Sequence, residues 1–246
     1  MDLPTPGSEL RRRFWPAAGL LVVLIALFTW LPRLSRPAAA PVDLEPLRSV
    51  ATTRKDLALT FDISWGTVMP PKVLSILERE KVPATIFISG PWAKQNPEII
   101  KRLYKDGLEI ESHGWKHVNY SQLASGQIAE NIQKADEALK SIVPVTPRFI
   151  RPPNGDYSKR VAEVAAGLGY RLVIWDTDSR DWMNPGVANI INRVTQRAHP
   201  GDIVLLHASD TCKQTDLALP AIIRDLRTKG YRFLTLKDLL KESEGR

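Results

Sequence analysis

Short apolar stretches alternate with helix-like stretches along most of the chain. Ile128, Ile132, Ala135, Leu139 and Ile142 illustrate the helical spacing, because they recur every three or four positions and would form one buried stripe. Seven runs rich in β-branched or other apolar residues have the length of strands, and each is followed by a helical pattern: residues 57–64, 84–89, 107–113, 148–153, 171–177, 202–208 and 231–236. The pattern therefore predicts seven β-α units.

Repeated β-α units require parallel strands, which form either an open doubly wound sheet or a closed barrel. Periodicity does not choose between the two. Polar residues lie at or just after the C-terminal ends of five different runs, namely Asp62, His113, Arg151, Asp178 and His207. Those ends converge on one mouth in a barrel, whereas an open sheet spreads them across its width. We therefore expect an α/β barrel.

The N-terminal residues do not share this pattern. Three consecutive arginines from Arg11 precede a nearly charge-free apolar run at residues 14–31. At about 1.5 Å per helical residue, this run just spans a hydrocarbon core of about 30 Å. We expect residues 1–13 to be a basic cytoplasmic N-terminus and residues 14–31 a single-pass transmembrane helix, which places the C-terminal domain outside the cytoplasm.

A proline-rich segment at residues 32–50 is expected to be a stiff spacer, so that the folded domain covers residues 51–246. A cleaved signal peptide is the alternative to the anchor, with the alanines at 38–40 as the small residues that cleavage needs. Signal peptides have a shorter apolar region, and Pro41 directly after the alanines would hinder cleavage. These two features favour the anchor.

The net charge of +7 adds little about partners. The first 41 residues carry +3 of it, and no dense basic tract indicates nucleic acid. A mildly basic face suits an anionic wall polymer, although a solvated surface of Lys and Arg is the commoner explanation. Cys212 is the only cysteine, so there is no intramolecular disulfide, and no heptad run or apolar outer face indicates an oligomeric state.

Three of the four histidines lie at expected strand ends or in the loop just after one. His113 and His117 are four residues apart in Ser-His-Gly-Trp-Lys-His, so one helical turn would bring both imidazoles within reach of one metal ion. A pair with this spacing is usually not a ligand set on its own. The neighbouring motifs decide how it is interpreted.

Asp62 ends an otherwise apolar run, where a charge costs stability unless it is paired. Arg151, in Arg-Pro-Pro-Asn-Gly-Asp-Tyr, is a suitable partner because the two prolines stiffen the loop and the guanidinium can point at a carboxylate. A purely structural ion pair is the alternative. At the other end of the chain, His207 ends an apolar run and could act as a general acid, with Asp181 or Asp178 on its second nitrogen.

The order and content of five motifs resemble the polysaccharide deacetylases, the NodB-homology group of carbohydrate esterases, over essentially all of residues 51–246. The motifs are Phe-Asp-Ile-Ser-Trp-Gly, Ser-His-Gly-Trp-Lys-His, Arg-Pro-Pro-Asn-Gly-Asp-Tyr, Asp-Ser-Arg-Asp-Trp and His-Ala-Ser-Asp. Within that group they look most like a sporulation-associated branch of spore-forming bacteria. The resemblance implies a distorted (β/α)7 barrel.

The resemblance also implies residue roles. Asp62 would be the catalytic base, oriented by Arg151, and His207 the acid, tuned by Asp181. A divalent metal ion, most often zinc, would be bound by His113 and His117. The expected substrate contacts are Trp115, Tyr157, Trp182 and Leu205, which lie in or beside these motifs.

The chain departs from the family pattern at one position. A second Asp usually follows the first and is the third metal ligand, whereas this chain has Ile63 there. Isoleucine cannot replace a carboxylate, and two imidazoles are usually too few for a catalytic metal. The remaining ligand candidates are Asp62, Ser64 and Asp178, and the use of Asp62 would cost the site its base.

The leading hypothesis is removal of N-acetyl groups from the amino sugars of a cell-wall glycan such as peptidoglycan. The main alternative, motivated by Ile63, is a glycan-binding or scaffold protein with the same fold. Glycoside hydrolysis by Asp178 and Asp181 is a third alternative, but it leaves the two-histidine motif unexplained.

Overall fold

The computed structural model describes residues 44–244. Its strands are β1 (Asp56–Ile63), β2 (Thr85–Ile88), β3 (Glu109–Ser112), β4 (Phe149–Ile150), β5 (Arg171–Leu172), β6 (Thr177–Asp178), β7 (Ile203–His207) and β8 (Arg232–Phe233). Its α-helices are α2 (Met69–Glu80), α3 (Gly90–Gln95), α4 (Pro97–Lys105), α5 (Ser125–Lys140), α6 (Lys159–Gly167), α7 (Val187–Arg197), α8 (Thr215–Thr228) and α9 (Leu236–Glu244).

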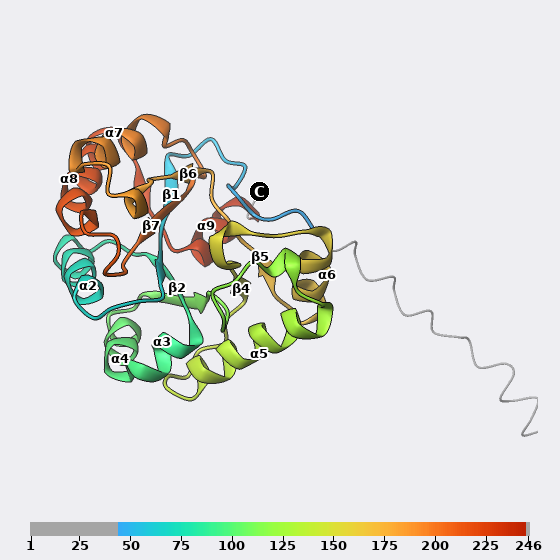
Figure 1. Cartoon of the computed structure of the whole chain (residues 1–246). Coiled ribbons are helices and arrows are strands. Elements are labelled where there is room, and N and C mark those ends of the chain that lie inside the picture. The colour runs from blue at the N-terminus through green and yellow to red at the C-terminus, as the bar shows by residue number, and fades with distance from the viewer. Residues whose placement is uncertain (1–43, 245–246) are drawn as a thin grey trace, which may run out of the picture. The chain divides into compact units, whose positions relative to one another are not determined.

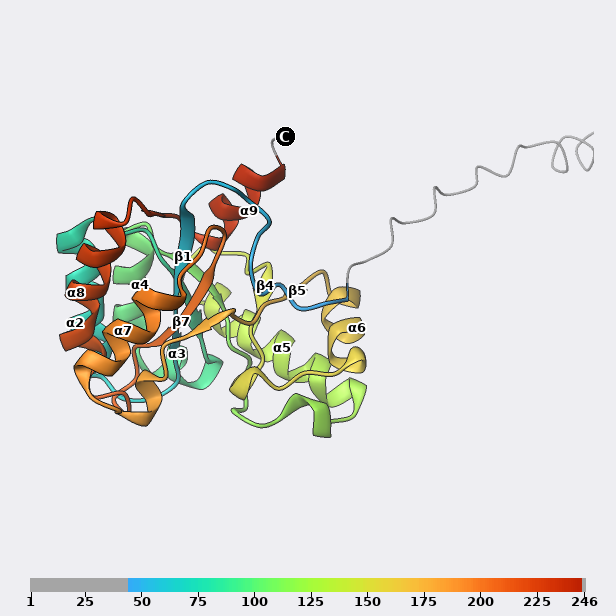
Figure 2. The same cartoon turned by 90° about the horizontal axis from the view of Figure 1, so that it is seen from above.

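The strands form one parallel sheet in the order β5-β4-β3-β2-β1-β7-β6, and β8 pairs with the start of β1. The sheet is curled, with helices packed around its outside (Figure 1, and from above in Figure 2). All seven expected strand runs contain a strand, so the parallel α/β architecture is confirmed.

One expected strand, at residues 171–177, is divided in two. Its first part is β5, which pairs with β4, and its last part lies in β6, which pairs with β7 at the other end of the sheet. The chain therefore changes partner partway and links the two ends of the curled sheet. This division explains why seven expected runs give eight strands.

Side chains along β1 point alternately into the apolar core and toward the inner face of the curled sheet. Leu57, Leu59, Phe61 and Ile63 belong to the large apolar cluster that the helices cover. Side chains of a strand point alternately to its two faces, so Asp62 lies on the opposite face, inside the curl. β1 is an interior strand, paired with β2 on one side and β7 on the other, and this pairing on both sides holds Asp62 in place.

The segment before β1 is partly structured. Leu47 is buried, and its amide and carbonyl bond to Leu172 and Ile174, in and just after β5. The expected spacer therefore ends before residue 50, because its last residues pair with the sheet. The expected cytoplasmic N-terminus and transmembrane helix lie outside the described residues. No helix within residues 44–244 is long and apolar enough to cross a membrane.

Candidate active site

A cavity of about 450 Å³ opens at the C-terminal ends of the strands. Asp62 and His207 lie side by side in it, because they are register partners on the adjacent strands β1 and β7. The cavity is lined by Asp62, Ser64, Trp65, His113, His117, Asn154, Trp175, Asp178, Trp182, Leu205, His207, Ser209, Thr211 and Cys212. The expected convergence of polar strand ends is therefore present in the structure.

Asp62 and Arg151 form a buried ion pair. Arg151 Nη1 lies 2.8 Å from Asp62 Oδ1, and Nη2 donates to the Thr60 hydroxyl and the Ile174 carbonyl. The guanidinium also lies over the Phe87 ring and is fully buried. Burial alone would raise the pKa of Asp62, but the charge of Arg151, aided by His113, outweighs burial and lowers this pKa. Asp62 is therefore ionised.

His113 is fixed as a neutral ring. It follows β3, and its Nδ1 lies 2.8 Å from the carbonyl oxygen of Arg151, to which a proton on this nitrogen would be donated. Burial lowers the pKa of His113 to about 4, although the charge of Asp62 opposes this. The lone pair is therefore on Nε2, which faces Asp62 Oδ2 at 3.8 Å.

The loop after His113 brings His117 to the cavity. Gly114 has a φ of +76°, and a Cβ there would lie 1.9 Å from the Tyr120 hydroxyl, so only glycine fits this turn. The rings of His113 and His117 meet edge to face with centroids 5.4 Å apart, and the Trp65 ring lies 4.6 Å from the His117 ring, centroid to centroid. Both expected metal-binding histidines thus line the cavity.

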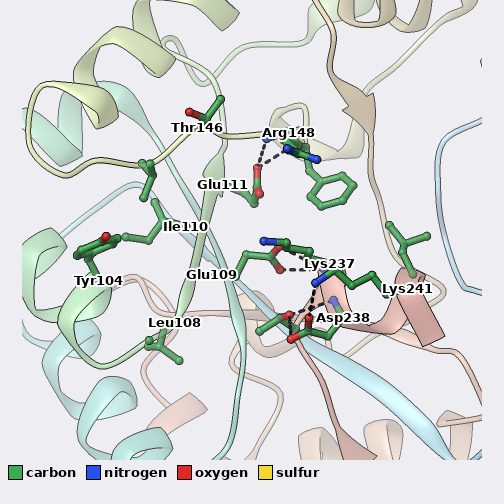
Figure 3. A pocket seen from close by; sticks show the side chains of 15 residues that line it. Tyr104, Leu108, Glu109, Ile110, Glu111, Thr146, Arg148, Lys237, Asp238 and Lys241 are labelled. Atoms are coloured by element: carbon green, nitrogen blue, oxygen red, sulfur yellow. Dashed lines mark hydrogen bonds and ion pairs between the residues drawn. The ribbon is translucent and has the colours of Figure 1, made fainter. Parts of the chain in front are cut away.

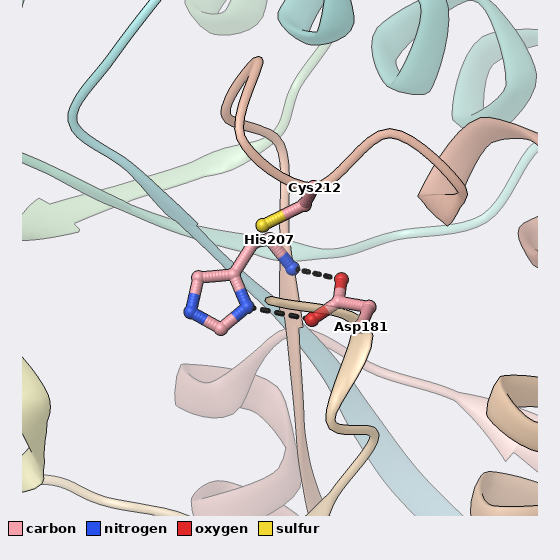
Figure 4. Close-up of side chains that lie close together, drawn as sticks. All are labelled: Asp181, His207 and Cys212. Carbon is pink, nitrogen blue, oxygen red and sulfur yellow. Dashed lines mark hydrogen bonds and ion pairs between the residues drawn. The ribbon is translucent and has the colours of Figure 1, made fainter. Parts of the chain in front are cut away.

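Asp181 and His207 form the second polar pair (Figure 4). His207 Nδ1 lies 2.7 Å from Asp181 Oδ1, and Oδ2 accepts from the His207 amide and the Thr215 hydroxyl. Burial alone would lower the pKa of His207, but the charge of Asp181 and its hydrogen bond outweigh burial and raise it. The structure therefore favours a protonated His207 beside an ionised Asp62.

The family model for polysaccharide deacetylase matches residues 49–173. The chain is also 36% identical over 206 residues to a peptidoglycan-N-acetylglucosamine deacetylase of Bacillus cereus, covering 81% of this chain and 96% of that protein. The chain belongs to the polysaccharide deacetylase family.

Other relatives within the family carry different descriptions. The chain is 32% identical to peptidoglycan-N-acetylmuramic acid deacetylase PdaA of Bacillus subtilis, covering 79% of this chain and 75% of that one. It is 31% identical to the uncharacterized protein YlxY of Bacillus subtilis, covering 81% of this chain but only 61% of YlxY. The chain therefore spans less than two thirds of the length of that relative.

Solved structures of the same fold include BA3943 of Bacillus anthracis, described as a CE4 family pseudoenzyme. It has a TM-score of 0.76 at 29% identity, covering 81% of this chain and 70% of that one. A mutant of BA3943, described as having restored enzymatic activity, matches with a TM-score of 0.76 at 30% identity, over 81% of this chain and 72% of that one. Membership of the family therefore does not by itself establish turnover.

The position at which the resemblance implies a third metal ligand is occupied by a core residue. Ile63 is 1% exposed and lies in the helix-covered apolar cluster, and it does not line the cavity. His113 and His117 line the cavity beside Asp62 and are the residues that would hold a divalent ion, but they do not form with Asp62 a group whose three ligand atoms all lie within 4.8 Å of one another. Ile63, next to Asp62, has no ligand atom.

A second group of ligand atoms lies beside the acid. Among the residues that the structure describes, Asp181, His207 and Cys212 are the one group of three His, Cys or acidic side chains whose ligand atoms all lie within 4.8 Å of one another. Both Asp181 oxygens already accept hydrogen bonds. Burial, with Asp181 nearby, raises the pKa of the Cys212 thiol to about 12, which keeps it protonated. The group suits a polar pair beside a packed thiol better than a metal.

The aromatic residues around the cavity differ in part from the expected set. Trp182 and Leu205 line it, as expected. Trp115 does not, because its ring packs against Gly90 in α3 under Lys94. Tyr157 also lies outside the lining, where its hydroxyl accepts a hydrogen bond from Arg48.

Two cavity-lining tryptophans were missed from the sequence. Trp65 lies within the Phe-Asp-Ile-Ser-Trp-Gly motif, and Trp175 precedes β6. Their place beside strand ends was the available signal, since residues just past the strands of such a sheet form its mouth.

Proposed function

We propose that this chain hydrolyses the N-acetyl group of an amino sugar in a cell-wall glycan, with peptidoglycan as the substrate class. The observation that carries the proposal is the adjacent placement of a carboxylate paired with a buried cation and a histidine paired with a buried carboxylate. Asp62 is bonded to Arg151, which lowers the pKa of Asp62, and His207 is bonded to Asp181, which raises the pKa of His207, on register partners of two neighbouring strands.

Amide hydrolysis needs these two states at once. A base must take a proton from the attacking water, and an acid must protonate the departing amine, which is otherwise a poor leaving group. Asp62 is assigned the first role and His207 the second, while Arg151 and Asp181 hold them in position. A divalent ion on His113 and His117, with zinc proposed, would lower the pKa of the water and polarise the acetamide carbonyl.

The substrate class is supported by the cavity and by the relatives. Trp182 and Trp65 are about half exposed at a cavity that is large enough for a sugar unit, and exposed rings beside polar groups suit stacking against a pyranose. Two relatives are described as peptidoglycan deacetylases, one acting on N-acetylglucosamine and one on N-acetylmuramic acid. We therefore propose peptidoglycan as the polymer on which this chain acts, without assigning one of the two sugars.

The cellular setting is proposed from the sequence. The apolar run at residues 14–31 would anchor the chain in the membrane, so that the deacetylase domain lies outside the cytoplasm against the wall. Similarity of the motifs to the sporulation-associated branch of the family supports a role in the wall of a sporulating cell.

A second candidate function is glycan binding without turnover, which Ile63 favours because it removes the usual third metal ligand. The same cavity and the same exposed tryptophans would bind the sugar.

The test measures acetate released by the full-length protein from peptidoglycan and from N-acetylglucosamine oligomers, after chelation and after zinc is added back. Zinc-dependent acetate release, lost in His207→Gln, is the expected result. His207→Gln is the matched control because it keeps the size of the side chain and removes the titrating group. Retained glycan binding with no acetate under any condition would establish the second candidate instead.

A further inference from the structure

The loop between β1 and α2, residues 64–68, carries Trp65 and is bonded to the loop that follows β7. The Ser64 amide donates to the Ser209 hydroxyl at 3.1 Å. The Asp210 amide donates to the Trp65 carbonyl, also at 3.1 Å. The two loops are therefore joined through the backbone of Trp65 and of the residue before it.

The side chain of Asp210 adds three more bonds between the two loops. Its Oδ1 accepts from the Val68 and Met69 amides at 3.0 and 2.7 Å, and its Oδ2 accepts from the Thr67 amide at 3.1 Å. Gly66, just before these amides, has a φ of +78°, and a Cβ there would lie 2.0 Å from Asp210 Cγ. Only glycine lets the carboxyl group come so close to the loop.

Helix α2 has no side-chain cap of its own. The first four amide positions of a helix have no partner within it, and here they belong to Val68, Met69, Pro70 and Pro71. An N-cap side chain normally accepts from the second or third helical residue, but both of these are prolines and have no N–H. Asp210 accepts from the two N–H groups that remain. The start of α2 therefore depends on a residue 142 positions away from Val68.

The place of the Trp65 ring follows from this bonding. The ring lines the cavity, lies 4.6 Å from the His117 ring between centroids, and is 49% exposed. On the other side of Trp65 in the chain, the Gly66 carbonyl accepts from Trp92 Nε1 at 2.7 Å. The backbone is thus fixed on both sides of Trp65, while half of the ring is open to a ligand. A shift of the loop would move the ring away from His117.

We propose that Asp210 is a positioning residue for the substrate, because it holds Trp65 at the cavity as a surface against which the sugar packs. Asp210 itself does not line the cavity, so it acts through Trp65 and not by touching the sugar. Since Asp210 comes three residues after His207, the same bonds set the place of Trp65 relative to the proposed acid. The inference rests on the proposed function for the identity of the ligand, an amino-sugar oligomer.

The first experiment measures the affinity of the full-length protein for N-acetylglucosamine oligomers by calorimetry. Asp210→Ala and Trp65→Ala should each weaken binding about 5-fold, because each takes a stacking surface away from the sugar. In the Trp65→Ala background, Asp210→Ala should weaken binding less than about 2-fold, since no ring is left to misplace. Asp210→Asn keeps one acceptor oxygen, so its affinity should lie between those of the wild type and Asp210→Ala.

Thr235→Ala is the matched control for the loss of a helix cap. Thr235 Oγ1 accepts from the Asp238 amide at 3.2 Å at the start of α9, and Thr235 does not line the cavity that Trp65 lines. Thr235→Ala and Asp210→Ala should both lower the melting temperature, but only Asp210→Ala should weaken binding below that temperature. Wild-type affinity in Asp210→Ala would show that its role is confined to stability and would overturn the proposal.

The second experiment needs no ligand. The Trp65 indole gives one of seven tryptophan signals in a proton–nitrogen correlation spectrum, and Trp65→Phe identifies it. This signal should shift or broaden in Asp210→Ala and stay in place in Thr235→Ala. An unchanged Trp65 signal in Asp210→Ala contradicts the proposal, and so do equal losses of affinity from Asp210→Ala with and without Trp65.

These results are separable from the test of the proposed function. A protein that binds oligomers through Trp65 and Asp210 but releases no acetate would uphold this inference and refute the deacetylase. An active protein in which Asp210→Ala leaves KM unchanged would do the reverse. A wild-type protein that binds no oligomer would refute the sugar contact at Trp65 and the proposal with it.

Discussion

Two cavities at opposite ends of the sheet each contain a buried carboxyl group in a different electrostatic environment. The cavity of about 530 Å³ in Figure 3 lies at the N-terminal ends of β3 and β4, where Glu111 Oε2 accepts from the Arg148 and Phe149 amides. Burial raises the pKa of Glu111 to about 8. Asp62, in the cavity at the other end, is equally buried: it is 6% exposed and Glu111 is 5% exposed. The pKa of Asp62 is nevertheless lowered.

The difference is the buried cation. Two backbone amides stabilise a carboxylate too weakly to offset its loss of hydration, whereas the guanidinium of Arg151 offsets it. Equal burial therefore gives a neutral acid at one end of the sheet and an ionised base at the other. A buried cationic partner, and not burial itself, distinguishes the carboxyl group whose pKa is lowered from the one whose pKa is raised.

The largest effect on the rate is expected from a substitution of Asp62, the ionised carboxylate of the two. Asp62→Asn should lower acetate release by about 1000-fold, the range of a lost general base, because an amide cannot accept the proton. The rate constant for acetate release from peptidoglycan fragments is the measurement. Glu111→Gln should retain the wild-type rate at pH 7, and comparable losses in the two variants would mean that the contrast between the cavities is not functional.

Asp181→Asn should have the next largest effect, lowering the rate by about 100-fold. His207 acts in its protonated form, so the rate falls as pH rises through the His207 pKa, which Asp181 raises. Without that charge the pKa falls, and the alkaline limb of the pH–rate profile should move to lower pH. If the alkaline limb of the pH–rate profile does not move in Asp181→Asn, it reflects the titration of a group other than His207.

Glu111 gives the third prediction, on stability. Its pKa in the folded state is about 8 against 4.5 as a model value, so folding favours the protonated form. This contribution is complete below pH 4.5 and is lost as pH rises through the folded pKa, by up to about 5 kcal/mol.

Glu111→Gln keeps an acceptor for the two amides and removes the titrating carboxyl group. The melting temperature of the variant should therefore lack the pH dependence that Glu111 causes in the wild type. Compared with the wild type, the variant should gain stability as pH rises from 5 to 8. Thermal unfolding at both pH values measures the difference. Parallel curves for the two proteins would show that Glu111 does not titrate in this range.

The strands and the polar side chains at the cavity could be predicted from the sequence because both follow from short-range rules. Period-two alternation in β1 places Asp62 on the inner face, and parallel β-α units bring the strand ends of His113 and His207 to the same mouth. The division of residues 171–177 into β5 and β6 could not be predicted in this way, since it depends on which neighbour each half meets.

The loops and the first residues of the domain were harder to predict. Residues 44–50 resemble a spacer in composition, yet Leu47 pairs with the sheet, because backbone hydrogen bonding does not depend on side-chain type. Aromatic residues in loops follow no helix or strand periodicity, so the sequence does not show which way their side chains point. Trp115 and Trp65 follow their strands at similar distances, and only the packed structure shows that the first faces α3 and the second the cavity.

The smallest predicted effect uses that difference between tryptophans. Trp182 lines the cavity and is 52% exposed, so Trp182→Ala should remove a stacking surface and raise KM by about 5-fold with little change in kcat, equivalent to about 1 kcal/mol of binding. Trp115→Ala removes the same side chain from the packing against α3, and should instead lower the melting temperature while KM stays unchanged. Steady-state kinetics on soluble peptidoglycan fragments, with both variants measured below their melting temperatures, makes the comparison. An equal rise of KM in Trp115→Ala would mean that the whole loop after His113 positions the substrate. A tryptophan would then not need to line the cavity in order to affect sugar binding.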